Sequence, residues 1–253
     1  MTIWAIADLH LSFGVPSKHM RVFGEQWENY TDKIEQAWRS AVSDDDLVLI
    51  PGDISWAMRL EEARLDLDWI GQLPGTKVLL KGNHDYWWSS LSKIKTILPP
   101  SCHLIQNNSF NWNGASIAGA RLWDVPGLSF NEIIDFKDFA CVKKLTETDE
   151  SDESRKIYER ELVRLESSLK AMDTKAKLRI AMTHYPPVGP NLQETDVSRL
   201  LEKYGVQICV FGHLHNVKPH LTLFGVRNGI SYQLTACDYL NSFKPIKIAD
   251  NPA

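Results

Sequence analysis

Short runs of apolar residues alternate with segments of helical periodicity along most of the chain. Several runs are continuously apolar, as expected of strands that are covered on both faces. The strand candidates are Thr2–Ala7, Asp46–Pro51, Lys77–Lys81, Ala115–Leu122, Leu178–Thr183, Val206–Phe211 and Ile230–Thr235. Apolar residues recur at helical spacing in two places, namely at Leu60, Ala63, Leu67 and Ile70, and at Leu162, Leu165, Leu169 and Met172. This alternation predicts an α/β layered fold.

The chain shows no obvious division into separate domains. Its 253 residues suffice for one large α/β domain or two small ones. We find no internal repeat and no linker rich in Pro, Gly or Ser, so we expect residues 1–253 to form a single domain. One composition shift occurs at Thr146–Arg155, which is polar and acid-rich and predicts a solvated loop leading into a helix near Ile157–Met172. The alternating charges of Glu153–Lys170 predict a solvated helix face.

Composition and charge narrow the possible partners and the compartment. The formal net charge is -4, so no global basic field draws the chain to long nucleic acid. The net charge does not exclude a local basic groove. The four cysteines lie far apart without a CxxC pair, which disfavours a thiolate metal site or a disulfide framework. The first apolar run is too short for a signal peptide, and no stretch reaches membrane length. We therefore expect a cytoplasmic protein without membrane association.

Polar motifs directly follow five of the predicted strands. They are Asp8-Leu9-His10, Gly52-Asp53, Gly82-Asn83-His84-Asp85, His184 and Gly212-His213-Leu214-His215. In open α/β sheets, ligands gather beyond the carboxyl ends of the strands. If these strands share a sheet, all five motifs converge on one edge.

The residue types in these motifs indicate a metal centre. Four imidazoles, two carboxylates and one amide oxygen make a mixed nitrogen and oxygen donor set without sulfur. Such a set suits Mn, Fe, Zn, Co or Ni better than Mg or Ca, which prefer oxygen shells. Seven donors exceed what one tetrahedral ion needs but suit two ions that share a bridging carboxylate. The candidate metal ligands are Asp8, His10, Asp53, Asn83, His184, His213 and His215.

The order of these motifs resembles the calcineurin-like metallophosphoesterase family. Its pattern, DxH … GD … GNH[DE] … H … GHxH, is matched over residues 8–215, in order and with family-like spacing. Within the family, the segments PGDISWAM, KGNHDYWW and THYPP around the motifs are most similar to bacterial predicted phosphohydrolases of undefined substrate. The resemblance implies two mixed β-sheets packed face to face with helices outside, a four-layer sandwich.

The resemblance also implies a role for each site residue. Asp53 would bridge two divalent ions, with Mn, Fe or Zn the expected metals. The first ion would be held by Asp8, His10 and His215, and the second by Asn83, His184 and His213. His84 would face the substrate, either as general acid for the leaving oxygen or as a stabiliser of phosphoryl charge. The implied reaction is in-line attack on phosphorus by a metal-bridging hydroxide, in a phosphodiester, phosphomonoester or pyrophosphate.

One departure from the family narrows the substrate. The protein Ser/Thr phosphatases carry the motif GDxVDRG. The aspartate before its arginine orients the catalytic histidine, and the arginine binds phosphate. Here Ile54–Met58 follows Gly52-Asp53, so neither residue has a counterpart and phosphoprotein phosphatase activity is doubtful. Whatever orients His84 comes from elsewhere, and Asp85 is not assigned that role. We expect a small phosphorylated or nucleotide-like substrate. The rival hypothesis is a non-catalytic metal-binding scaffold with the same fold.

Aromatic residues near the motifs have two interpretations. For Tyr86-Trp87-Trp88 and Trp56, core packing is favoured, and the alternative is a wall that stacks on a flat part of the substrate. Arg121 and Trp123 are a candidate recognition pair, because Arg suits phosphate, although surface pairing explains them nearly as well.

Overall fold

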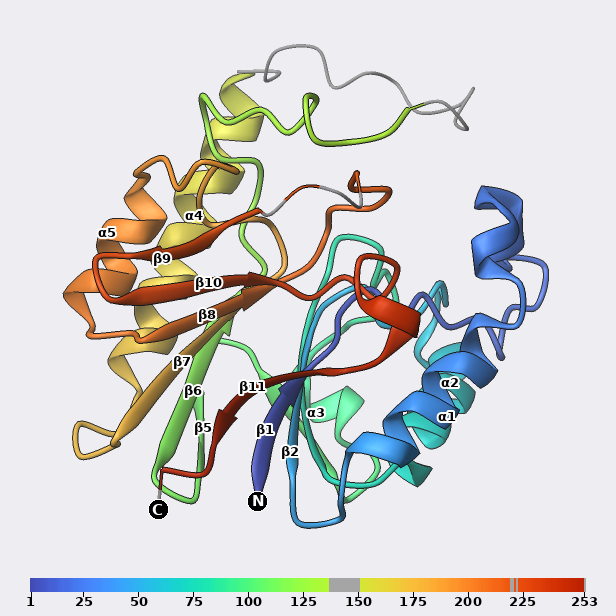
Figure 1. The fold of residues 1–253 in the computed structure, drawn as a ribbon. Helices are drawn as coiled ribbons and strands as arrows, with labels where there is room; N and C mark the ends of the chain where they lie inside the picture. The colour runs from blue at the N-terminus through green and yellow to red at the C-terminus, as the bar shows by residue number, and fades with distance from the viewer. Residues whose placement is uncertain (137–150, 219–220, 222, 253) are drawn as a thin grey trace.

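Two β-sheets pack face to face in the part of the chain that the computed structural model describes, which is residues 1–136, 151–218, 221 and 223–252 (Figure 1). The five-stranded sheet has the order β11-β1-β2-β3-β4 and the six-stranded sheet the order β5-β6-β7-β8-β10-β9. The first sheet is formed by β1 (Thr2–Ala5), β2 (Leu47–Pro51), β3 (Thr76–Leu80), β4 (Cys102–Ile105) and β11 (Ile246–Asp250). The second is formed by β5 (Ser109–Trp112), β6 (Ala115–Ala120), β7 (Leu178–Thr183), β8 (Ile208–Phe211), β9 (Gly225–Arg227) and β10 (Ile230–Leu234).

Both sheets are mixed. Their central strands run parallel, whereas β11 pairs antiparallel with β1, β5 with β6, and β9 with β10. β7 has the predicted bounds, and the other predicted strands are shorter or shifted by one or two residues. β4, β5, β9 and β11 escaped prediction because they are short runs of three to five residues at sheet edges.

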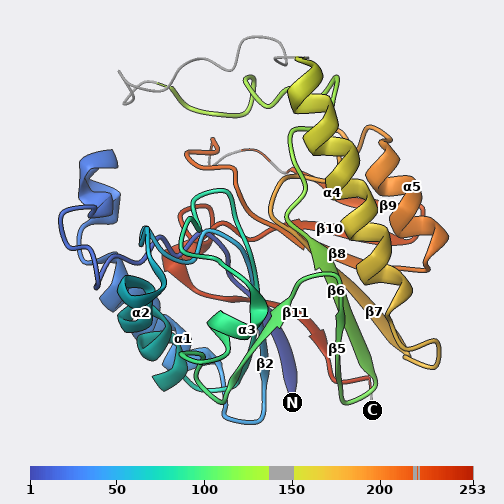
Figure 2. The same cartoon turned by 180° about the vertical axis from the view of Figure 1, so that it is seen from behind.

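Helices lie on the outer face of each sheet (Figure 2). The five-stranded sheet is covered by α1 (Tyr30–Ala41), α2 (Leu60–Gln72) and α3 (Leu91–Ile94), and the six-stranded sheet by α4 (Asp152–Lys170) and α5 (Asp196–Lys203). Three short 3-10 helices complete the described elements, namely η1 (Met20–Phe23), η2 (Glu25–Trp27) and η3 (Asn241–Phe243). Within the described ranges, no helix is both long and apolar enough to span a bilayer.

Three hydrophobic clusters separate the layers. One fills the space between the sheets and includes Ile3, Leu49, Val78, Ile180 and Val210, all fully buried. A second lies between the five-stranded sheet and its helices, and a third between the six-stranded sheet and α4 and α5. The layer order is therefore helix, sheet, sheet, helix, which confirms the predicted sandwich of two mixed sheets.

The predicted loop at Thr146–Arg155 is wrong where the structure describes it. Residues 146–150 lie outside the described ranges, and α4 already begins at Asp152. The hydroxyl of Ser151 accepts a hydrogen bond from the backbone N–H of Ser154, and Asp152 and Glu153 occupy the first turn. A serine cap and acidic residues in the first turn both stabilise a helix start, so polarity here marks a helix terminus rather than a loop.

The five motif-bearing strands do not share one sheet. β1, β2 and β3 belong to the five-stranded sheet, and β7 and β8 to the six-stranded sheet. The motifs still meet, because the two sheets are joined where these strands end. Beyond β1, the N–H of Ala7 donates to the carbonyl of Thr235 at 2.7 Å, and the N–H of Cys237 donates to the carbonyl of Ala7 at 3.0 Å. The motifs therefore converge as predicted, but they do so across two joined sheets and not along the edge of one sheet.

Candidate metal centre

The backbone turns sharply where the strands end and the polar motifs begin. Asp8, His10, Asp53 and His213 have positive φ angles of 59°, 45°, 50° and 74°. This left-handed conformation is uncommon for residues other than glycine. It is fixed by hydrogen bonds between loops, from the N–H of Asp8 to the carbonyl of Gly52 at 3.0 Å and from the N–H of His10 to the carbonyl of Asp53 at 2.9 Å. Backbone strain of this kind concentrates at functional sites.

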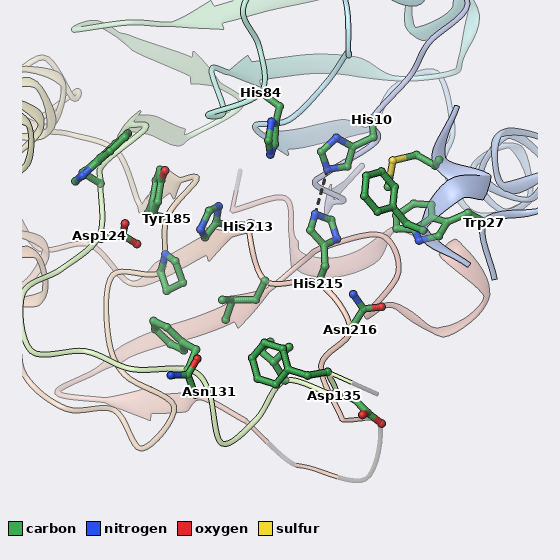
Figure 3. A pocket seen from close by; sticks show the side chains of 18 of the residues that line it. His10, Trp27, His84, Asp124, Asn131, Asp135, Tyr185, His213, His215 and Asn216 are labelled. Atoms are coloured by element: carbon green, nitrogen blue, oxygen red, sulfur yellow. Dashed lines mark hydrogen bonds between the residues drawn. The ribbon is translucent and has the colours of Figure 1, made fainter. Parts of the chain in front are cut away.

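Four of the seven predicted ligands form a first cluster. Asp8, His10, Asp53 and His215 each offer a donor atom, and these atoms lie within 4.8 Å of one another. The Nε2 atoms of His10 and His215 face each other at 3.0 Å (Figure 3). Oδ2 of Asp53 lies 3.7 Å from Nε2 of His10. Asp8, His10 and Asp53 are almost fully buried.

The other three predicted ligands form a second cluster next to the first. Oδ1 of Asn83 lies 2.6 Å from Nε2 of His184 and 2.9 Å from Nδ1 of His213. Asp53 reaches this cluster too, because its Oδ1 is 3.4 Å from Nε2 of His184. The Asp53 carboxylate therefore faces both groups of donors, one with each oxygen. All seven side chains come together.

Two of the histidines are held by their other ring nitrogen. Nδ1 of His215 pairs with Oδ1 of Asp238 at 2.9 Å, and Nδ1 of His184 lies 3.1 Å from the carbonyl of Pro51. Such partners direct Nε2 toward the donor cluster, the arrangement that metal-binding histidines usually have. Sequence reasoning missed Asp238. It follows β10 closely, just as the recognised motifs follow their strands, so the same signal would have found it.

Burial controls the charge of the donors. It lowers the pKa of His184 to about 3. Burial and the neighbouring imidazoles hold the pKa of His10 and of His213 well below the ordinary histidine value. Burial also lowers the pKa of His215, but the Asp238 carboxylate outweighs it and raises that pKa to about 9. Burial raises the pKa of Asp8 well above the ordinary carboxyl value.

The donor set fits divalent cations. The neutral imidazoles of His10, His184 and His213 offer lone pairs, and buried carboxylates lack the water that would otherwise solvate their charge. The Nε2 atoms of His10 and His215 lie 3.0 Å apart, and Nδ1 of His10 is buried without a hydrogen-bond partner among the described residues. A dication between these groups would satisfy the facing nitrogens and compensate both carboxylates.

The imidazole ring of His84 is positioned by packing, whereas its backbone is held by the Asp53 carboxylate. Its backbone N–H donates to Oδ1 of Asp53 at 2.8 Å, which ties it to the donor clusters. Its ring lies 4.5 Å from the Trp56 ring and 5.7 Å from the His10 ring, between centroids. Nδ1 of His84 is buried without a hydrogen-bond partner among the described residues. Burial lowers the pKa of His84, although Asp53 opposes this.

Asp85 has a structural role next to His84. Its buried carboxylate accepts hydrogen bonds from the backbone N–H groups of Ile54 at 2.9 Å and Gly82 at 2.7 Å, and from Nε1 of Trp87 at 3.0 Å. It thereby joins the loop after β2 to the loop after β3. These contacts agree with the expectation that Asp85 does not orient His84.

The metal centre forms one end of a largely apolar cavity of about 320 Å³ (Figure 3). Its lining includes the aromatic side chains of Trp27, Trp56, Trp123 and Tyr185. The Trp56 ring stacks on that of His10, with centroids 4.8 Å apart. Among the described lining residues there is no Lys or Arg.

The aromatic residues near the motifs divide between the two interpretations. Trp87 and Trp88 are buried in the core, as favoured, whereas Trp56 lines the cavity. Tyr86 is 56% exposed. The guanidinium of Arg121 lies 5.0 Å from the centre of the Trp123 ring.

Comparison with known proteins places this geometry in a family. One solved structure, the phosphopantetheinyl hydrolase PptH of Mycobacterium tuberculosis, superposes with a TM-score of 0.60 at 16% identity, over 99% of this chain and 96% of that one, which shows a common fold. The Gene 66 protein of Mycobacterium phage L5 is 35% identical over 82 residues, 32% of this chain and 39% of that protein. The model of the calcineurin-like phosphoesterase family matches residues 1–217, a span that contains every motif described above, and the chain therefore belongs to that family.

Proposed function

We propose that the protein hydrolyses a phosphoester at a dinuclear metal centre. The observation that carries this proposal is the placement of Asp53, whose two oxygens face two separate donor clusters at 3.7 Å and 3.4 Å. In this proposal Asp8, His10 and His215 hold one ion, Asn83, His184 and His213 hold the other, and Asp53 bridges them. Two bound divalent ions would supply a hydroxide nucleophile and neutralise the phosphate oxygens.

The chain's own residues would then orient and protonate. His84 lines the cavity beside the first cluster, where a ring N–H would donate to the leaving oxygen or to a phosphoryl oxygen. Trp56 packs against the His84 ring and so restricts its orientation. Asp238 holds His215 so that Nε2 keeps its direction.

The cavity favours a small substrate with a flat or apolar group. Trp27, Trp56 and Trp123 offer ring faces on which such a group would stack. The described lining contains Asp124 and Asp135 but no Lys or Arg, so away from the metal ligands a highly charged leaving group gains little there. The M. tuberculosis protein of similar fold, 16% identical to this chain, is named a phosphopantetheinyl hydrolase. Phosphopantetheine-like esters are therefore one class to include in a substrate screen.

The direct test is turnover by purified protein with added Mn²⁺. We expect release of nitrophenol from bis-p-nitrophenyl phosphate or p-nitrophenyl phosphate, and its loss after treatment with a chelator. Asp53→Ala should bind neither ion, because it removes the shared ligand, and should be inactive. Arg155→Gln, on an exposed side chain of α4, serves as the control with one charge removed. Full metal occupancy without turnover on any ester would favour the scaffold hypothesis. Retention of both ions by Asp53→Ala would refute the bridge.

A further inference from the structure

A second cavity, of about 240 Å³, lies beyond the ends of β3, β4 and β6. Its lining is cationic, in contrast to that of the apolar cavity. Lys81 follows β3 and Arg121 follows β6, while Arg160 and Arg164 come from α4. The proposed phosphoester chemistry uses none of these four side chains.

The positive charge in this cavity exceeds the negative charge that faces it. Glu161 is the one acid among the described lining residues and is only 1% exposed. Its Oε1 lies 2.6 Å from Nη1 of Arg164, 3.7 Å from Nη2 of Arg121 and 4.0 Å from Nε of Arg160. One carboxylate therefore serves three guanidinium groups, and Lys81 adds a fourth cation.

Two polar groups of the lining lack partners among the described residues. The ammonium of half-buried Lys81 makes no hydrogen bond or ion pair with them. Oγ of Ser89 is buried and makes no hydrogen bond. A buried hydroxyl without a partner carries a desolvation cost, and a lysine at a cavity wall is a donor available to a ligand. Lys81 and Ser89 belong to the same lining as the three arginines.

We propose that this cavity is a second oxyanion site, which binds a phosphate-type dianion. The guanidinium groups and Lys81 supply charge-assisted hydrogen bonds, and Ser89 supplies a hydroxyl donor. The site adjoins the metal centre through the backbone. The carbonyl of Arg121 accepts hydrogen bonds from the N–H groups of His184 at 3.1 Å and Tyr185 at 3.0 Å. The dianion is either a second phosphate group of the substrate or a free phosphate ion.

Calorimetric titration of the Mn²⁺-loaded protein with inorganic phosphate tests the site. We expect two phosphates per chain, one at the metals and one in the cationic cavity. Lys81→Gln should weaken one of the two binding events at least about tenfold, the scale of one charge-assisted hydrogen bond, without changing the metal content. Arg160→Gln provides a second variant with the same expected result, and Arg155→Gln, on the same helix but away from the cavity, is the matched control.

The outcomes separate this site from the proposed function. If metal-dependent hydrolysis fails but the phosphate event sensitive to Lys81→Gln remains, the oxyanion site stands alone. If wild type and both variants bind phosphate with the same stoichiometry and affinity, the oxyanion site is refuted, whether or not the enzyme turns over.

A kinetic comparison identifies the source of the dianion. If the dianion is a second phosphate of the substrate, Lys81→Gln should raise the KM for adenosine 3′,5′-bisphosphate relative to the KM for adenosine 5′-monophosphate at least about tenfold. For a free phosphate ion, that ratio stays constant while the calorimetric event is still weakened.

Discussion

Gly82→Ala tests whether the shape of the loops fixes the metal centre. No Cβ fits at Gly82, because it would lie well inside 3.0 Å of both Oδ1 and the backbone nitrogen of Asp53, a separation that real Cβ atoms essentially never show. The φ angle of Gly82 is not in the left-handed range, so the added methyl group acts by contact alone. Because ordinary contact begins at 3.4 Å, Asp53 or the loop would have to move by about 1 Å or more.

The size of the effect follows from this displacement. A shift of about 1 Å in a positioned group costs on the order of 10²-fold in rate, and overpacking costs about 1–3 kcal/mol of stability. We expect Gly82→Ala to fold, to lose metal content measured by elemental analysis, and to lower turnover of bis-p-nitrophenyl phosphate at least about 100-fold. Gly189→Ala is the control, since its Cβ would meet nothing closer than 3.2 Å. Two retained ions and turnover within twofold of wild type would refute the reasoning.

Three further substitutions test separate parts of the site and fold. His84→Asn should keep both ions in elemental analysis yet lower turnover by about 10²–10⁴-fold, and unchanged turnover would remove His84 from the mechanism. Asp238→Asn should weaken metal affinity about 10–100-fold in a chelator competition, because the neutral amide holds His215 less firmly, and equal affinity would exclude that support. Burial raises the pKa of Asp66 to about 6, so this carboxyl lowers the stability of the wild type by up to about 3 kcal/mol as the pH rises from about 4 to 6, and Asp66→Asn should lose that much less. Parallel denaturation curves for the two proteins across this range would contradict the last expectation.

The strands and motifs were predictable because each carries a local signal. β7 contains the apolar run Ile180–Met182, and its bounds agree with the predicted ones. The donors were predictable because His and Asp directly follow such runs. α1 was not, although its buried Ile34 and Trp38 lie four residues apart, because charged and polar residues dominate the rest of the segment.

The contacts between different loops that hold the site residues in place could not be predicted from the sequence. Trp56 and His84 are 28 positions apart, and nothing local indicates that one ring packs on the other. The same is true of Asp85, whose carboxylate binds N–H groups from two loops. The charge pattern of α4 also hid the burial of Glu161, because a partner such as Arg121 lies in a distant segment. Contacts of this kind depend on the pairing of whole elements, which single-sequence periodicity does not encode.

The strained backbone links metal binding to the stability of the fold. Asp8, His10, Asp53 and His213 hold left-handed angles, each at a cost of about 1–3 kcal/mol. These four strained residues all carry donors, and hydrogen bonds between the loops after β1 and β2 offset part of their strain. An ion present at 100 times its dissociation constant adds about 2.7 kcal/mol, close to the strain at one donor. A bound ion would therefore offset strain in the loops that form the centre. The hydrogen bonds that Asp85 accepts from Ile54 and Gly82 join the loops after β2 and β3 without any ion.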